Sequence, residues 1–263
     1  MFLLNLPLWA ALLLLLVIAV LISHYGIKLV HKFYKYEHLK ESHEISGFIF
    51  NAYGLLYAVV IAFVIYINWG EYNEAQRKVY VEINSASNLF HSAQGFNDSA
   101  KKIVMANLIA YTETVYFDDF GAMEKLNRSE KNRAAYDSLW DSFLRIDAQA
   151  AGNQILYDHC LSELRTLSEA RRMRYHYMEN TIPIVIWVVM IVGYFIALMF
   201  AYLFGMKYRN PYLILLIAFT YINILMLYLI LVLDYPFTGY SAISKEPYAV
   251  ILNHFKEVFS AIK

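Results

Sequence analysis

The chain has 263 residues, 59% of them hydrophobic and 17% charged, and it carries no formal net charge at neutral pH. This composition is typical of a membrane protein with one substantial polar region, and it excludes an ordinary soluble enzyme domain. Its single cysteine, Cys160, excludes an internal disulfide framework and a cysteine-based metal site. The balanced charge argues against nucleic acid as a partner.

The first apolar segment covers residues 3–22 and is long enough to cross a bilayer as a helix. No basic side chain precedes it, whereas a cleaved signal peptide begins with a basic stretch, so we expect a retained membrane span. The connector 24–46 follows, and its lysines are mixed with glutamates, as expected for a segment at the level of the lipid headgroups.

Residues 47–69 form the second apolar segment, with 23 consecutive positions free of charge. At 1.5 Å per residue, this segment spans the roughly 30 Å of bilayer hydrocarbon. The polar stretch up to residue 88 follows without a proline. The sequence therefore predicts one continuous helix that leaves the membrane near Trp69.

One face of this second span carries mostly small side chains at helical spacing. Its members are Asn51, Gly54, Ala58, Ala62 and Ile65. Small residues let helices approach closely in lipid, so the stripe is consistent with a packing seam. It is also consistent with the lining of a narrow pore, with Asn51 as the polar group within the membrane. Both interpretations hold together if the neighbouring helix belongs to another subunit.

The polar region covers residues 70–181, and its apolar residues recur with the period of a helix rather than a strand. We expect a bundle built from the continuation of the second span's helix and three further helices. These are a helix capped by Asp98 or Ser99 that runs to Asp118–Asp119, a helix over 129–149 and a helix over 153–177. The two adjacent aspartates are interpreted as a solvated helix end.

The sequence offers no catalytic centre. None of the common nucleophile, phosphate-binding or dinucleotide-binding motifs is present. His159 and Cys160 are adjacent, so they leave a helix about 100° apart and cannot act on each other as nucleophile and base. We therefore predict no enzyme activity, no metal site and no cofactor.

Residues 182–234 contain the third and fourth spans, over 182–204 and 212–233. Pro183 suits the first turn of a helix, where a missing N–H group costs nothing. Thr220 and Asn223 lie within the fourth span, where a hydrogen bond to a neighbouring helix is a commoner role than contact with an ion. Residues 235–263 are expected to form a polar, helical tail.

Four spans bring the end of the second, the start of the third and the end of the fourth to the same side of the membrane. The charged residues near this boundary that we single out are Glu71, Glu74, Arg171, Arg172, Arg174 and Asp234. Interfacial ion pairing accounts for them, with the three arginines as candidate partners of Asp234. The alternative is an electrostatic vestibule, in which Glu71 and Glu74 concentrate ions before a pore.

Two stretches together resemble a known family. They are GFIFNAYGLLYAVVIAFVIYINWGEYNEA (47–75) and LDYPFTGYSAIS (233–244), and the second contains a membrane-edge motif of Asp234, Pro236, Phe237 and Gly239. With the Arg-rich helix before the third span, they resemble the uncharacterised bestrophin-like membrane family of prokaryotes. The order of spans is similar to that of bestrophins proper, which are pentameric ion channels. Bestrophins also have an acidic calcium clasp, and the sequence shows no matching cluster, which argues against calcium gating.

The fold expected from these observations is an all-α membrane protein, with four spans and a helical bundle between the second and third. The leading function is an oligomeric ion channel whose pore is lined by the second span, and the alternative is a non-conducting scaffold or sensor. The expected partners are the lipid bilayer of a bacterial plasma membrane, inorganic ions and further copies of the chain. The positive-inside rule places the bundle outside the cytoplasm, whereas the resemblance implies the reverse. The rule is applied to the basic residues of the two opposite loops, which are Lys28, Lys32, Lys35, Lys40, Lys207 and Arg209.

Overall fold

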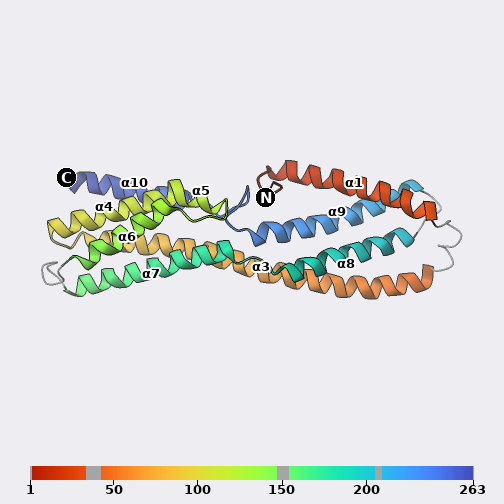
Figure 1. Ribbon diagram of the computed structural model, residues 1–263, viewed down its shortest axis with the longest axis horizontal. Coiled ribbons are helices and arrows are strands. Elements are labelled where there is room, and N and C mark those ends of the chain that lie inside the picture. Colours follow the sequence, from red (N-terminus) through yellow and green to blue (C-terminus); the bar gives the residue numbers. More distant parts are fainter. Residues whose placement is uncertain (1, 34–42, 147–153, 205–208, 263) are drawn as a thin grey trace. The chain divides into compact units, whose positions relative to one another are not determined.

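The computed structural model describes residues 2–33, 43–146, 154–204 and 209–262, and in these ranges all regular secondary structure is helical (Figure 1). The predicted all-α class is confirmed. The chain divides into two compact units. One contains residues 1–70 and 181–235, and the other contains residues 71–180 and 236–263. We call them the membrane unit and the bundle. The basic residues Lys35, Lys40 and Lys207, which entered the prediction of orientation, lie outside the described residues.

The membrane unit contains α1 (Leu8–Phe33), the first part of α3 (His43–Ala93), α8 (Ile184–Leu203) and α9 (Arg209–Asp234). Each of these helices is long and apolar enough to cross a bilayer, which confirms the four predicted spans. The long helix α3 runs through 51 residues without a break, as the absence of proline predicts. The chain is therefore a multi-pass membrane protein.

Helices α1 and α9 lie side by side and share a buried polar contact (Figure 1). Ser23 of α1 donates a hydrogen bond to the hydroxyl of Thr220 on α9 over 3.1 Å. Thr220 thus has the interhelical role that the sequence favours for a polar side chain in a span. Asn223, by contrast, donates to the carbonyl of Phe219 on its own helix over 2.8 Å.

Helix α3 packs against α8 through two tyrosines. The rings of Tyr53 and Tyr57 are stacked, with centroids 6.0 Å apart. Their hydroxyls donate to the carbonyls of Gly193 and Met190 respectively. A Cβ atom at Gly193 would lie 2.5 Å from the Tyr57 ring. The close approach of the two helices therefore requires glycine at this position.

The bundle combines the second part of α3 with the helices that follow it and with the C-terminal helix. These are α4 (Asp98–Thr114), a π-helical turn η1 (Val115–Asp119), α5 (Phe120–Met123), α6 (Glu130–Leu144), α7 (Gln154–Glu179) and α10 (Glu246–Ile262). Helix α4 is capped by Asn97, whose side chain accepts from the amide of Ala100 over 2.9 Å. The predicted cap at Asp98 or Ser99 was wrong by one or two residues, because Asp98 already lies in the first helical turn.

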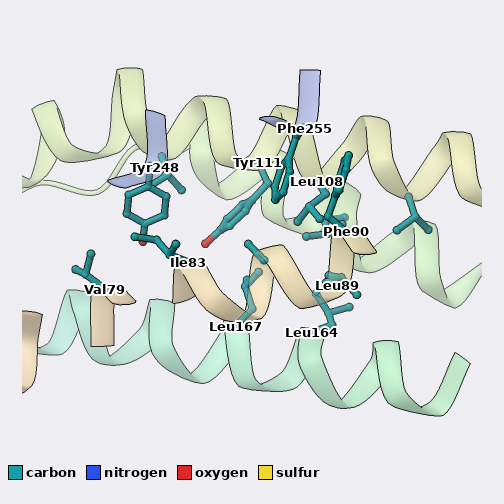
Figure 2. Close-up of a cluster of buried hydrophobic side chains, with 14 of the residues drawn as sticks. Val79, Ile83, Leu89, Phe90, Leu108, Tyr111, Leu164, Leu167, Tyr248 and Phe255 are labelled. Carbon is teal, nitrogen blue, oxygen red and sulfur yellow. The ribbon is translucent and has the colours of Figure 1, made fainter. Parts of the chain in front are cut away.

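The core of the bundle is apolar and aromatic. Figure 2 shows side chains from α3, α4, α7 and α10 pointing into one interior. The rings of Phe90 on α3 and Phe255 on α10 stack with centroids 4.0 Å apart, a contact that adds to the free energy gained from burial. Tyr248 and Leu252 of α10 are buried in the same way. The C-terminal tail, which the sequence analysis set apart, is thus part of the bundle.

Candidate functional site

The small-residue stripe of α3 lies beside, and not within, the face that packs against α8. Tyr57, at the packed face, and Ala58, in the stripe, are about 100° apart around the helix axis. Ala58 and Ala62 are exposed in the membrane unit, and Asn51 is exposed at the first end of the stripe. A Cβ atom added at Gly54 would meet nothing within 4 Å. Most of the stripe is therefore left uncovered by its own chain, while Gly54 and Ile65 are partly buried.

Four members of the stripe border a groove of about 380 Å³ in the membrane unit. The opposite side of the groove is formed by Ala197 of α8 and by Phe219, Ile222, Asn223 and Met226 of α9. Asn223 is the polar side chain among these, which places it opposite the stripe. The sequence separated the stripe from Asn223, and the fold brings them to one groove.

Asp234 ends α9 and is almost completely buried, with 4% of its surface exposed. One carboxylate oxygen accepts the backbone amide of Ile182 over 2.7 Å, and the other faces the indole N–H of Trp187 at 3.4 Å. Ile182 lies just before the start of α8, where backbone amides have no partner within the helix. Arginines were the expected partners of this carboxylate, and the partner that the structure shows is a backbone amide at a helix N-terminus.

The rest of the membrane-edge motif forms a turn in the bundle. Gly239 has φ of 85°, a left-handed conformation that favours glycine. The carbonyl of Pro236 accepts the amide of Ile243 over 2.8 Å and so closes the turn. Phe237 was assigned to a motif at the edge of the membrane. It is instead buried in the bundle core, edge-on to Phe120 with ring centroids 6.0 Å apart.

The predicted vestibule acids lie near the start of the bundle part of α3. Glu74 accepts a hydrogen bond from Arg77 over 2.6 Å; the Arg77 side chain is largely exposed and that of Glu74 is partly exposed. Glu71 and Glu74 both approach Tyr177 of α7. Burial and these two negative charges raise the pKa of Tyr177. The acids thus lie on the side of α3 that approaches α7.

Arg174 is completely buried in the bundle, where it binds two carboxylates from other helices. Its Nε and Nη2 donate to Glu82 of α3 over 2.8 and 3.1 Å, and its Nη1 donates to Asp119 of η1 over 2.7 Å. Tyr111 donates to Glu82 over 2.6 Å, and Tyr175 donates to Asp119 over 2.8 Å. We call these five residues the buried ion network.

The network corrects two expectations. Arg174 was a candidate partner of Asp234, and its guanidinium is instead bound by Glu82 and Asp119. Asp119 was interpreted as a solvated helix end, and it is completely buried. Burial alone lowers the pKa of Arg174, but the charges of the two carboxylates outweigh burial and raise it. Burial and the charge of Glu82 also raise the pKa of Tyr111, which keeps its hydroxyl protonated.

Comparison with known proteins assigns the chain to a family. Residues 15–248 match the Bestrophin-like domain, which is most of the chain. The chain belongs to the bestrophin-like family. No curated protein is similar enough in sequence to count as a match.

Solved structures share the fold of this bestrophin-like chain. A mutant of a bacterial Bestrophin homolog from Klebsiella pneumoniae is 13% identical, with a TM-score of 0.69 over 95% of this chain and 98% of that one. A second mutant of that homolog is 12% identical, with a TM-score of 0.70 over 98% of both chains. A structure described as a membrane protein is 12% identical, with a TM-score of 0.71. At such low identity, the likeness concerns the fold alone.

The bestrophin-like chain did contain a sequence signal for the buried ion network, and it was missed. On α7, Arg174 continues the apolar stripe of Cys160, Leu164, Leu167 and Met178 at spacings of four, three or seven residues. Glu82 interrupts the matching stripe on α3. A charged residue in an apolar helical stripe must be buried with a partner of opposite charge. Asp119 carries a similar signal, because it lies four residues after Val115 and eleven after Leu108 on one helical face.

Proposed function

We propose that the chain is one subunit of an oligomeric ion channel in which the membrane part of α3 lines the conducting path. The observation that carries this proposal is the exposure of α3 within its own chain. Only 6% of its most apolar stretch is buried, against 17% for the corresponding stretch of α9 and 28% for those of α1 and α8. A helix that contacts so little of its own subunit is available to line a path between subunits.

The chemistry of the exposed stripe suits a conducting path. Asn51 is polar and exposed, and an exposed amide is unfavourable against lipid hydrocarbon but not against water. Further along, Ala58, Ala62 and Ile65 are apolar. Apolar constrictions of this kind gate by dewetting. A stripe that begins polar and becomes apolar therefore provides a wet entrance followed by a gate.

Gly54→Leu tests the role of the stripe. Since a Cβ atom at Gly54 meets nothing within 4 Å, the new side chain has room in an isolated subunit. A neighbouring subunit or a narrow path would be overpacked, at a cost of about 1–3 kcal/mol. We expect loss of the oligomer or of ion flux in liposomes. Ala52→Leu is the matched control, because Ala52 is exposed on another face of the same helix turn.

The two proposals for the function separate in the same assay. If Gly54→Leu assembles and conducts like the unmodified chain, the stripe faces lipid and α3 does not line the path. If the unmodified chain is oligomeric in liposomes but never conducts at any voltage or pH, the channel proposal is wrong and the scaffold or sensor takes its place.

A further inference from the structure

A second hollow lies in the bundle, between α6 and α7, with a volume of about 480 Å³. This volume is in the range of small-molecule binding sites. Four arginines border it, together with a single carboxylate from Glu169. They are Arg128, from the segment before α6, and Arg165, Arg171 and Arg172, from α7. We call this hollow the arginine pocket.

The positive charge of the arginine pocket is largely uncompensated. Arg128 is paired with Glu179 over 2.7 Å. Among the described residues, no carboxylate lies within 4 Å of the guanidinium groups of Arg165, Arg171 or Arg172. Arg165 and Arg172 are seven residues apart on α7, so they lie on one face about two turns from each other. Like charges gathered around one hollow repel each other unless an anion lies between them.

Arg171 is held in place by neutral groups. Its guanidinium carbon lies 4.4 Å from the centre of the Tyr136 ring and 4.9 Å from that of Tyr175. Its Nε donates to the amide oxygen of Asn132 over 3.1 Å. These contacts restrict the Arg171 side chain without neutralising its charge. The side chain therefore loses little rotamer freedom when it binds a ligand. Trp140 also borders the pocket and is fixed by a hydrogen bond to Ser168 over 3.1 Å.

We propose that the arginine pocket binds a small organic phosphate, with the phosphate on Arg165, Arg171 and Arg172 and the organic part against Trp140. Arginine presents a planar fork that matches the oxygens of a phosphate in pairs. The pocket is larger than one phosphate group needs, and Trp140 gives it an apolar side for the rest of the ligand. A phosphate group could come from a soluble molecule or from a lipid headgroup. The soluble source is favoured because the residues that border the pocket belong to the bundle and none of them to a membrane span. The proposal does not depend on whether the chain conducts ions.

Binding of inorganic phosphate and of phenyl phosphate to the full chain in detergent tests the assignment. Phenyl phosphate differs from inorganic phosphate by one flat ring, so tighter binding of phenyl phosphate reports contact with Trp140. The double variant Arg165→Gln/Arg172→Gln removes two exposed guanidinium groups and should weaken both ligands by about tenfold or more, since each charge-assisted hydrogen bond is worth a factor of that order. Arg133→Gln is the control, because Arg133 is exposed on α6 outside the pocket. It should leave both affinities unchanged.

Several outcomes would overturn the proposal. The first is that neither ligand binds. The second is that the control variant weakens binding as much as the double variant does, which would indicate unspecific charge attraction. Equal affinity for the two ligands would remove the role of Trp140. If neither ligand binds in detergent, and the double variant instead lowers the retention of phosphatidylglycerol in nanodiscs, the source is a lipid headgroup and the soluble ligand is wrong.

Discussion

Replacement of Arg174 by methionine should destabilise the bundle more than any exposed substitution. The guanidinium is completely buried and makes three hydrogen bonds to Glu82 and Asp119, each between 2.7 and 3.1 Å. Methionine has a similar length but no charge. The variant would therefore keep two carboxylates in the interior without their cation.

The magnitude follows from the burial of the pair. Breaking a buried ion pair by removing one partner costs about 3–5 kcal/mol, because the other partner remains charged and unsolvated. Here one cation serves two carboxylates, so the upper part of that range applies. For a unit of the size of the bundle, this corresponds to a fall of roughly 10–20 °C in the apparent midpoint of thermal unfolding. Tyr111 and Tyr175 still donate hydrogen bonds to the two carboxylates in the variant, which limits the loss of stability.

The assay is thermal unfolding of the full chain in detergent. Unfolding is monitored by limited proteolysis at sites within the bundle. The informative control is the triple variant Arg174→Met/Glu82→Gln/Asp119→Asn, in which all three charges are removed together. Since the cost comes from unpaired charge, the triple variant should regain most of the lost stability. If Arg174→Met unfolds within about 2 °C of the unmodified chain, or if the triple variant is no better than the single one, the electrostatic account is wrong.

Three further predictions concern reactivity, orientation and selectivity. Burial raises the pKa of the Cys160 thiol to about 11, so maleimide at pH 8 should label it only after denaturation; the stability gained by keeping the thiol neutral is complete below its ordinary pKa of about 9 and is lost as the pH rises toward 11. Ser138→Cys provides an exposed reporter on α6, and labelling by an impermeant maleimide in intact cells would place the bundle outside the cytoplasm, while labelling only after lysis would place it inside. Glu71→Gln with Glu74→Gln should shift the reversal potential in a salt gradient toward anions, more strongly at low ionic strength; unchanged selectivity would contradict the vestibule.

The membrane part of the fold could be predicted because one strong physical constraint determines it. A segment without charge that is long enough to cross the hydrocarbon must be a helix, since lipid offers no partner for free backbone groups. The continuity of α3 followed from the absence of proline after Trp69. The contacts between the spans did not follow in the same way. The packing of Tyr57 against Gly193 depends on which helices become neighbours. A single sequence does not determine which helices are adjacent.

The buried position of Asp119 agrees with helical periodicity, which the sequence analysis did not apply to this residue. Asp119 lies four residues after Val115 and eleven after Leu108, so at 100° per residue its side chain falls on the same face as these buried residues. The two adjacent aspartates were interpreted instead as the end of a helix, whereas the π-helical turn η1 continues directly into α5. The error thus came from the expected end of the helix and not from its register.

Tyr175 connects the two features of the bundle that the sequence analysis did not foresee. Its hydroxyl donates to Asp119 in the buried ion network, and its ring lies 4.9 Å from the guanidinium carbon of Arg171 in the arginine pocket and 5.1 Å from that of Arg174. Arg171 and Arg174 are three residues apart on α7, so one tyrosine contacts both the buried and the accessible cation. The position of Arg171 therefore depends on Tyr175, and Tyr175 is itself held by the buried ion network. The sequence analysis interpreted the arginines of α7 as one charge cluster at the membrane edge. In the structure they have two roles: Arg174 is a buried structural ion-pair partner, and Arg171 borders a pocket that is open to a ligand.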